Sequence, residues 1–328
     1  MTAVGDARNL FSLVRKGIDS RAVAAHVRKP FRFLLCGDPA LVVALRALLL
    51  SGHTDGVPLD AAACLETIAP GSSSVTNPNE VRAVIFLGYP GDADGADFEP
   101  LRTLRAPILA VTVDPAAQPS GPAAAPASGA WAQYVVPALE RDALRERAFP
   151  HLIECASGVE IAVGRRLPVL RDSVAAKLTR DAANNALKVA LASAVVDHIP
   201  LVGVVLGAFA SAGDMVAITG IQVMLMLHIE AAYGRDPDVQ RTWQLLPVIG
   251  GGFGWRTLAR ELAGFVPVAG IAIKGAIAYA GTIVVGEGVT FFQEHGRHMT
   301  KGQAAQVYDR TKREALRFAR DIVAKLRR

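Results

Sequence analysis

The sequence predicts an N-terminal α/β domain followed by an all-α domain that is apolar and rich in glycine. Two observations predict this division. Between residues 31 and 160, continuous apolar runs of strand length alternate with helical segments, which is typical of a parallel sheet covered on both faces. After residue 160 the alternation stops, and long helical segments follow, two of which carry almost no charge.

Four apolar runs are expected to form the sheet, with helices between them. Polar or Pro/Ala/Ser/Gly-rich stretches at 70–79 and 115–130 are expected to be exposed loops. The expected strands are residues 32–37, 81–91, 106–115 and 132–138.

Four segments are expected along the chain: an N-terminal amphipathic helix within 1–30, the α/β domain at 31–160, the apolar helical domain at 161–300 and a basic C-terminal helix at 301–328. Apolar residues of the last segment recur every three or four positions and form a narrow stripe, which predicts an amphipathic helix. The stripe consists of Val307, Thr311, Ala315, Phe318, Ile322 and Leu326.

The charge and the cysteine content indicate the expected cellular compartment and the expected classes of partner. The net charge is +5, and residues 297–328 hold ten Lys/Arg against three Asp/Glu. Beside an apolar domain, such a tail favours an anionic lipid membrane as partner. No aromatic residues interleave with the basic ones, so no nucleic acid is expected. Three widely spaced cysteines and the lack of a secretory signal predict the cytoplasmic side.

The segment "RFLLCGDPALVVALRALLLSG" has the layout of a phosphate-binding loop: a strand, Gly37, a turn and a helix. The motif G-x-x-x-x-G-K-[ST] would need Gly, Lys and Ser/Thr where Val42, Val43 and Ala44 stand. No lysine occurs between Pro30 and Ala176 that could replace the missing one. Without the Gly the loop does not close around phosphate, and without the hydroxyl Mg²⁺ loses a protein ligand.

The arginines at 32, 46 and 102 are the basic side chains that could still meet a phosphate, but none stands in the required register. The strand that would read the base ends in "VTVD", which keeps Asp114 and has Val111 and Thr112 where a GTPase has Asn and Lys. In strand order and loop positions this domain resembles a small GTPase of the Era kind. The resemblance implies the fold and not the chemistry, because nearly every nucleotide contact is altered. We therefore expect no cofactor and no catalytic site.

Two later stretches, "DMVAITGIQVMLMLHIEAAYG" (214–234) and "FVPVAGIAIKGAIAYAGTIVVGEG" (265–288), occur in order. Together they resemble the helical domain of unknown function number 697, which occurs in YcjF-like inner-membrane proteins and behind Era-like GTPase domains. The resemblance covers about residues 165–300. It implies membrane association and the company of a GTPase, and it implies no reaction.

The same stretches contain candidate polar and packing residues. Each charge-free run, the longest being 199–213, is shorter than the ~20 residues that cross a bilayer. A membrane-inserted domain and a buried soluble bundle therefore both remain open. The expected polar network is Asp214, Gln222, His228 and Lys274, and the expected helix-packing residues are Gly203, Gly207, Ala272, Ala276 and Ala280.

No catalytic or metal-binding constellation is found. His295 and His298 have a metal-like spacing without an acidic or Cys partner, and a solvated turn explains them better. The expected function is a non-catalytic GTPase-like (pseudo-GTPase) protein on the cytoplasmic face of the cytoplasmic membrane, acting as an anchor or interaction module. A GTPase or another protein, or a further copy of the chain, is the expected protein partner. The alternatives are a divergent GTP-binding NTPase, an assembling membrane effector or pore, and a cytoplasmic location.

Overall fold

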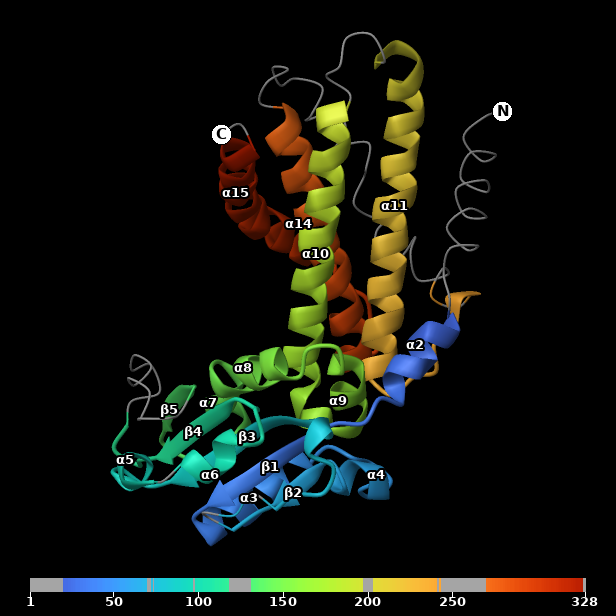
Figure 1. Cartoon of the computed structure of the whole chain (residues 1–328). Helices are drawn as coiled ribbons and strands as arrows, with labels where there is room; N and C mark the ends of the chain where they lie inside the picture. The colour runs from blue at the N-terminus through green and yellow to red at the C-terminus, as the bar shows by residue number, and fades with distance from the viewer. Residues whose placement is uncertain are drawn as a thin grey trace. The chain divides into compact units, whose positions relative to one another are not determined.

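The computed structural model describes residues 20–69, 72, 74–96, 98–117, 131–196, 203–240, 242 and 270–326, and Figure 1 shows their arrangement. Of these, the backbone alone is described for 20, 94–95, 193–196, 203–215, 270–274, 315 and 318–326. Two compact units are present. The sheet unit comprises Ala25–Lys177 and Ala232–Gly234. The helical unit comprises the described residues within Met1–Ala24, Leu178–Ala231 and Arg235–Arg328.

The sheet unit contains five parallel strands in the order β2-β1-β3-β4-β5. Strands occur at all four predicted segments, which confirms the α/β part of the prediction, and the short β2 was missed. The 2-1-3-4-5 order is one of the two common doubly wound orders. The strands are β1 Arg32–Gly37, β2 Leu65–Thr67, β3 Val81–Gly88, β4 Ile108–Val113 and β5 Ala132–Val136.

The central strands are buried almost throughout, as continuous apolar runs in a parallel sheet require. Phe86 of β3 packs edge-on against Phe98, with ring centroids 5.2 Å apart, and Leu101 joins the same cluster. Helix α2 Ser20–Val27 is divided between the units, because its residues up to Ala24 belong to the helical unit. The helices of the sheet unit are short. They are α3 Pro39–Leu49, α4 Leu59–Ala62, α5 Asp92–Gly95, α6 Glu99–Arg102, α7 Arg141–Arg145, α8 Ala148–Cys155 and α9 Glu160–Arg166, with 3₁₀ turns at Pro78–Glu80 and Pro168–Leu170.

Four long helices build the helical unit: α10 Arg171–Val196, whose residues up to Lys177 belong to the sheet unit, α11 Gly203–Ala232, α14 Gly270–His295 and α15 Lys301–Leu326. The long helices confirm the all-α part of the prediction. Two contacts between α14 and α10 show the relative direction of these helices. Gly286 of α14 lies against the early α10 residue Thr179, and Gly275 lies against the later Leu187. Helix α14 is therefore antiparallel to α10, as Figure 1 also shows.

Helices α14 and α15 form a hairpin with recognisable end signals. Gly296, with φ +64°, ends α14 in a left-handed conformation. Thr300 and Gln303 form a capping box at the start of α15, because each side chain accepts a hydrogen bond from the other residue's backbone N–H. Val307 and Thr311, the first two residues of the predicted apolar stripe, are buried, and Val307 packs with Ile283 of α14.

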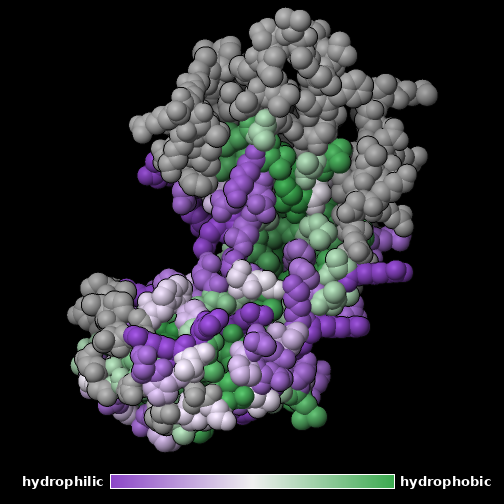
Figure 2. Space-filling model, in the orientation of Figure 1, coloured by the Kyte–Doolittle hydropathy of each residue, from purple (hydrophilic) through white to green (hydrophobic). Residues whose placement is uncertain are grey.

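Among the described residues, the segment Gly275–His295 of α14 is long and apolar enough to cross a membrane. Figure 2 shows hydrophobic atoms gathered along the helical unit beside a strip of hydrophilic ones. Over the visible face of the sheet unit, hydrophilic and intermediate atoms surround smaller hydrophobic patches.

Candidate functional site: the carboxyl edge of the sheet and the polar core of the helices

The carboxyl ends of β1 and β3 mark the point where the strand order reverses, which is where doubly wound sheets bind their ligands. Here the connection after β1 is very short. Strand β1 ends at Gly37 and α3 begins at Pro39, so Asp38 alone joins them. A single residue is too short to wrap a phosphate as a glycine-rich loop does.

Gly37 is needed at this point for a reason other than phosphate binding. Its φ is +112°, and a Cβ atom placed on it would lie 1.9 Å from the carbonyl oxygen of Leu87 in β3. The next backbone N–H, that of Asp38, donates to the same oxygen at 2.8 Å. The glycine thus allows β1 to leave the sheet directly against β3.

The N-terminus of α3 already holds an anion, which is the side chain of Asp38. Its Oδ1 accepts hydrogen bonds from the backbone N–H groups of Ala40, at 2.9 Å, and Leu41, at 3.0 Å. These are first-turn donors that a phosphate at a helix N-terminus would use. The carboxylate therefore satisfies the helix end in the way a bound phosphate would.

The predicted vestigial nucleotide positions are not brought together. Val42 is 4% exposed and belongs to the core under α3, whereas Val43, 68% exposed, and Ala44 lie on the outer face of that helix. Asp114 follows β4, and its carboxylate accepts the N–H of Ala116 at 2.9 Å. All three substituted positions fall inside a helix that begins before them, so they do not line a loop.

A third carboxylate occupies the same edge of the sheet. Asp92, after β3, accepts the N–H of Tyr89 at 2.7 Å. Asp38, Asp92 and Asp114 thus follow three neighbouring strands, and each is held by the backbone of its own turn. Their negative charges oppose the binding of a phosphate group. No group of three or more His, Cys, Asp or Glu residues suited to a metal ion occurs among the described residues.

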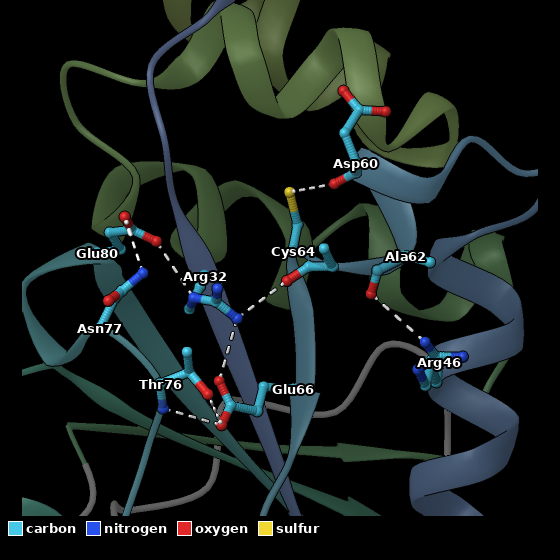
Figure 3. Close-up of polar contacts among 10 residues, drawn as sticks. Arg32, Arg46, Asp60, Ala62, Cys64, Glu66, Thr76, Asn77 and Glu80 are labelled. Carbon is cyan, nitrogen blue, oxygen red and sulfur yellow. Dashed lines mark hydrogen bonds and ion pairs between the residues drawn. The ribbon is translucent and has the colours of Figure 1, made fainter.

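The three arginines that could have met a phosphate have other partners. Arg32 starts β1, at the amino end of the sheet, and pairs with Glu66 and Glu80 at 3.2 Å each (Figure 3). Glu66 also accepts the N–H and hydroxyl of Thr76, and Glu80 accepts the amide of Asn77. This network fixes the segment before β3 to β1 and β2.

Arg46, also drawn in Figure 3, donates to the carbonyl oxygen of Ala62 at 3.4 Å and so connects α3 with α4. Arg102 pairs with Glu99 on its own short helix at 3.0 Å. The three arginines therefore hold structural contacts, and the side chains that follow β1, β3 and β4 at the carboxyl edge are aspartates.

The cysteines give no nucleophile. Burial raises the pKa of the Cys36 thiol to about 12 and that of Cys64 to about 11. The Cys64 thiol donates to the carbonyl oxygen of Asp60 at 3.0 Å (Figure 3). Burial also raises the pKa of Cys155 to about 11. All three thiols stay protonated at neutral pH, so the reactive thiolate is scarce.

In the helical unit, one member of the predicted polar network can be followed to its partner. Gln222 of α11 is buried and donates to Thr282 of α14 at 3.3 Å, while Thr282 donates to the carbonyl oxygen of Ala278 at 2.8 Å. Thr282 was missed as a site residue, although it stands in the second of the two resemblance stretches. The available signal was a threonine within the charge-free run 275–286. His228 is half-buried.

The isolated charges Asp214 and Lys274 lie in α11 and α14, in the part where the backbone alone is described. Ile218 of α11 and Ala278 of α14 belong to one cluster, and Gln222 meets Thr282 one turn further on. The two helices therefore run parallel with a constant offset. Asp214 and Lys274, one turn before Ile218 and Ala278, fall at the same level of the bundle.

Close helix contact in α14 depends on two glycines that were not predicted. A Cβ on Gly275 would lie 2.6 Å from Leu187 Cδ1, and a Cβ on Gly286 would lie 2.2 Å from Thr179 Oγ1. Of the predicted packing residues, Ala276 and Ala280 are fully buried. Gly203, Gly207 and Ala272 lie in helix segments of which only the backbone is described.

The Tyr-Gly pair that closes the first stretch has a structural role. Gly234, with φ +93°, follows α11, and the Tyr233 hydroxyl reaches Asp172 at 3.5 Å.

His295 and His298 do not converge on a common point. Each stacks on a different ring, Phe291 at 4.2 Å and Phe292 at 4.7 Å respectively.

The site is therefore a sheet edge at which three aspartates are held by the backbone of their own turns, and a helical core in which Gln222 of α11 bonds to Thr282 of α14. No protein-family model, no curated protein and no solved structure matches the chain.

Proposed function

We propose that this chain is a non-catalytic, GTPase-like protein that associates with the cytoplasmic face of a membrane through its helical unit and offers its sheet unit to a protein partner. Asp38 is the observation that carries the non-catalytic part. Its carboxylate holds the N–H groups at the start of α3, and it is the entire connection between β1 and α3. An incoming phosphate would have to displace this carboxylate and would be repelled by it.

The membrane part of the proposal rests on the uneven charge of the helical unit. No charged residue occurs in 189–196 at the end of α10, in 203–213 at the start of α11, or in 270–273 at the start of α14. Because α10 is antiparallel to the other two helices, these three segments lie at one end of the unit. Asp214 and Lys274, which follow two of these segments directly, are of opposite sign and fall at one level.

A shallow insertion of that end fits the contacts better than a complete crossing by α14. Glu287, near the middle of the apolar segment of α14, is bonded to Arg310 of α15 at 2.7 Å. A complete crossing would carry this pair and the charged face of α15 into hydrocarbon, at about 2.5–3.5 kcal/mol per charge on insertion scales. The opposite end, where the helix segments 189–196, 203–213 and 270–273 carry no charge, meets a smaller cost.

The C-terminal part of α15 adds an electrostatic attraction. Helix α15 runs back along α14, so its last turns lie toward the apolar end. Residues 316–328 contain five basic residues and one acidic residue. Each basic residue near an anionic surface contributes about 1 kcal/mol.

Vesicle binding tests the membrane part. The double variant Arg317→Gln, Arg320→Gln should bind anionic vesicles about 30-fold more weakly than the native chain and neutral vesicles equally well. Arg310→Gln is the matched control, because Arg310 is engaged by Glu287. Equal losses on both lipids, or an equal loss in the control, would contradict the proposal.

Calorimetry tests the non-catalytic part. GTP and ATP, each with Mg²⁺, should show no binding to the purified chain up to about 1 mM nucleotide, a concentration that detects even a 4 kcal/mol interaction. Magnesium-dependent binding below that concentration would overturn the assignment and support a divergent NTPase.

A further inference from the structure

Three rings gather between helix α8 and the edge strand β5, whose places Figure 1 shows. The Tyr134 hydroxyl of β5 is hydrogen-bonded to Nδ1 of His151 in α8, and the two ring centroids lie 5.6 Å apart. Trp131, directly before β5, packs edge to face with the same imidazole at 5.8 Å. Tyr134 is buried, whereas His151 and Trp131 are exposed. A buried hydroxyl therefore orients an imidazole that solvent reaches.

A half-buried thiol stands beside this imidazole. Cys155 follows His151 by four residues and is the last residue of α8. Side chains four residues apart on a helix are neighbours, with about 5–6 Å between their Cβ atoms. The same spacing brings both histidines of an H-E-x-x-H helix to one metal ion. Burial, and after it the charge of Cys155, raises the pKa of the Tyr134 hydroxyl to about 12, so the thiol also lies near that hydroxyl.

We propose that His151 Nε2 and Cys155 Sγ bind one copper(I) ion, with Tyr134 as the positioning residue. In the bound state Nδ1–H donates to the Tyr134 oxygen, which leaves the Nε2 lone pair to the ion. Histidines that bind metals almost always have such a partner on the other ring nitrogen, because it fixes the tautomer and the ring orientation. Among the described residues the His151 side chain makes no other hydrogen bond, so Nε2 is available.

The number and type of the ligands select the ion. A thiolate and an imidazole suit copper(I) and zinc. Zinc sites have at least three protein ligands. No group of three His, Cys, Asp or Glu residues suited to a metal ion occurs in the part of the chain that the structure describes, and Glu154, next to Cys155, pairs with Lys177 at 3.9 Å. Copper(I) is stable with two ligands on opposite sides, which this pair supplies.

The charge balance also favours a monovalent ion at this position. On binding, the S–H bond of Cys155 breaks, the proton goes to solvent, and the thiolate forms the bond to the ion. The charges of Cu⁺ and of the thiolate cancel, so the complex with a neutral imidazole has no net charge, which lowers the cost of half-burying it. Zn²⁺ would leave one positive charge there. This inference does not depend on the membrane or nucleotide parts of the proposed function.

Anaerobic titration of the full chain with copper(I), in competition with a chromophoric copper(I) chelator, tests the site. Cys155→Ser and His151→Ala should each bind the ion at least about tenfold more weakly than the native chain. Cys64→Ser is the matched control, because that thiol is buried, donates to the carbonyl oxygen of Asp60 and should not affect the affinity. Zn²⁺ in large excess should not displace the copper.

A native chain that binds no copper(I), or that binds it as tightly after Cys155→Ser or His151→Ala, would overturn the proposal. Displacement by Zn²⁺ would overturn the assignment of the ion. Circular dichroism checks that each variant is folded, as expected for substitutions at exposed and half-buried positions.

Tyr134→Phe tests the positioning role, because it removes only the hydroxyl from a buried ring. It should weaken copper(I) binding about tenfold while the chain stays folded. The ¹⁵N spectrum of the imidazole gives a second readout, since copper(I) should change the signal of Nε2 in the native chain and leave that of Nδ1 protonated. Unchanged affinity in Tyr134→Phe, or binding through Nδ1 in the native chain, would overturn this role.

Discussion

Glycine has a different role in each unit of this chain. In the sheet unit, Gly37 has a positive φ and lies against a backbone carbonyl, that of Leu87. In the helical unit, Gly286 has ordinary helical geometry and lies against a side chain, that of Thr179. A side chain at position 37 is therefore excluded by the backbone itself, whereas a side chain at position 286 is excluded only by the size of its neighbour. A second substitution that makes the neighbour smaller should therefore restore stability at position 286 and not at position 37.

Gly37→Ala should have the largest effect. The added Cβ would meet an immovable carbonyl at 1.9 Å in a strained conformation, and we expect a loss of more than about 3 kcal/mol in the free energy of unfolding. Urea unfolding, with hydrogen exchange of the β1 and β3 amides, measures it. Gly91→Ala is the matched control, because its φ is +91° and no atom lies within 4 Å of the added Cβ. It should lose only about 1–2 kcal/mol. Equal losses for the two variants would show that the contact with the Leu87 carbonyl oxygen does not add to the cost.

Gly286→Ala should cost about 2 kcal/mol through overpacking against Thr179. Here a second substitution should help: Thr179→Ala removes the two nearest atoms, Oγ1 and Cγ2, and should recover part of the loss. Gly220→Ala in α11 has open space around it and should be neutral or stabilise by up to about 1 kcal/mol. If Thr179→Ala gave no recovery, the size argument for this site would be wrong.

The elements that were predicted from the sequence are those with a strong local sequence pattern. Long apolar runs located β1, β3, β4 and β5, because buried parallel strands are continuously apolar. Strand β2 was missed because it is three residues long and contains Glu66, whose charge is satisfied by Arg32 from another part of the chain. Helix α10 continues through Asn184 and Asn185, two residues of low helix propensity, because they stay partly exposed while Ala183, Ala186 and Leu187 pack inside.

For the site, the sequence predicted the loss of the phosphate-binding residues and missed what replaces them. Asp38 was seen only as a turn residue, and its capping of α3 depends on where the helix begins, which sequence patterns fix poorly. The partners of Arg32 and Gln222 lie 34 to 60 residues away in the sequence. Such contacts depend on strand order and helix register, which no local pattern contains.

Arg32→Met tests the two ion pairs at the amino end of the sheet. Removing the guanidinium leaves Glu66 and Glu80 close together without a cation between them. Because these side chains are about one-fifth exposed, water offsets part of the loss, and we expect about 1–2 kcal/mol. Arg102→Met breaks an exposed pair within one short helix and should cost at most about 0.5 kcal/mol. Similar urea midpoints for the two variants would show that the partly buried Arg32 network stabilises the fold no more than the exposed pair does.

The contact between Gln222 and Thr282, which joins the two resemblance stretches, should give a small coupling energy. Gln222→Leu leaves the Thr282 hydroxyl bonded to Ala278, so its cost should be modest, about 0.5–1 kcal/mol. Thr282→Val leaves the Gln222 amide buried without that acceptor and should cost more, about 1–2 kcal/mol. The double variant should cost less than the sum, by about 0.5–1 kcal/mol, because no polar group is then stranded. A double-mutant cycle in urea measures this coupling, and strict additivity would mean that the hydrogen bond does not fix the register of α11 against α14.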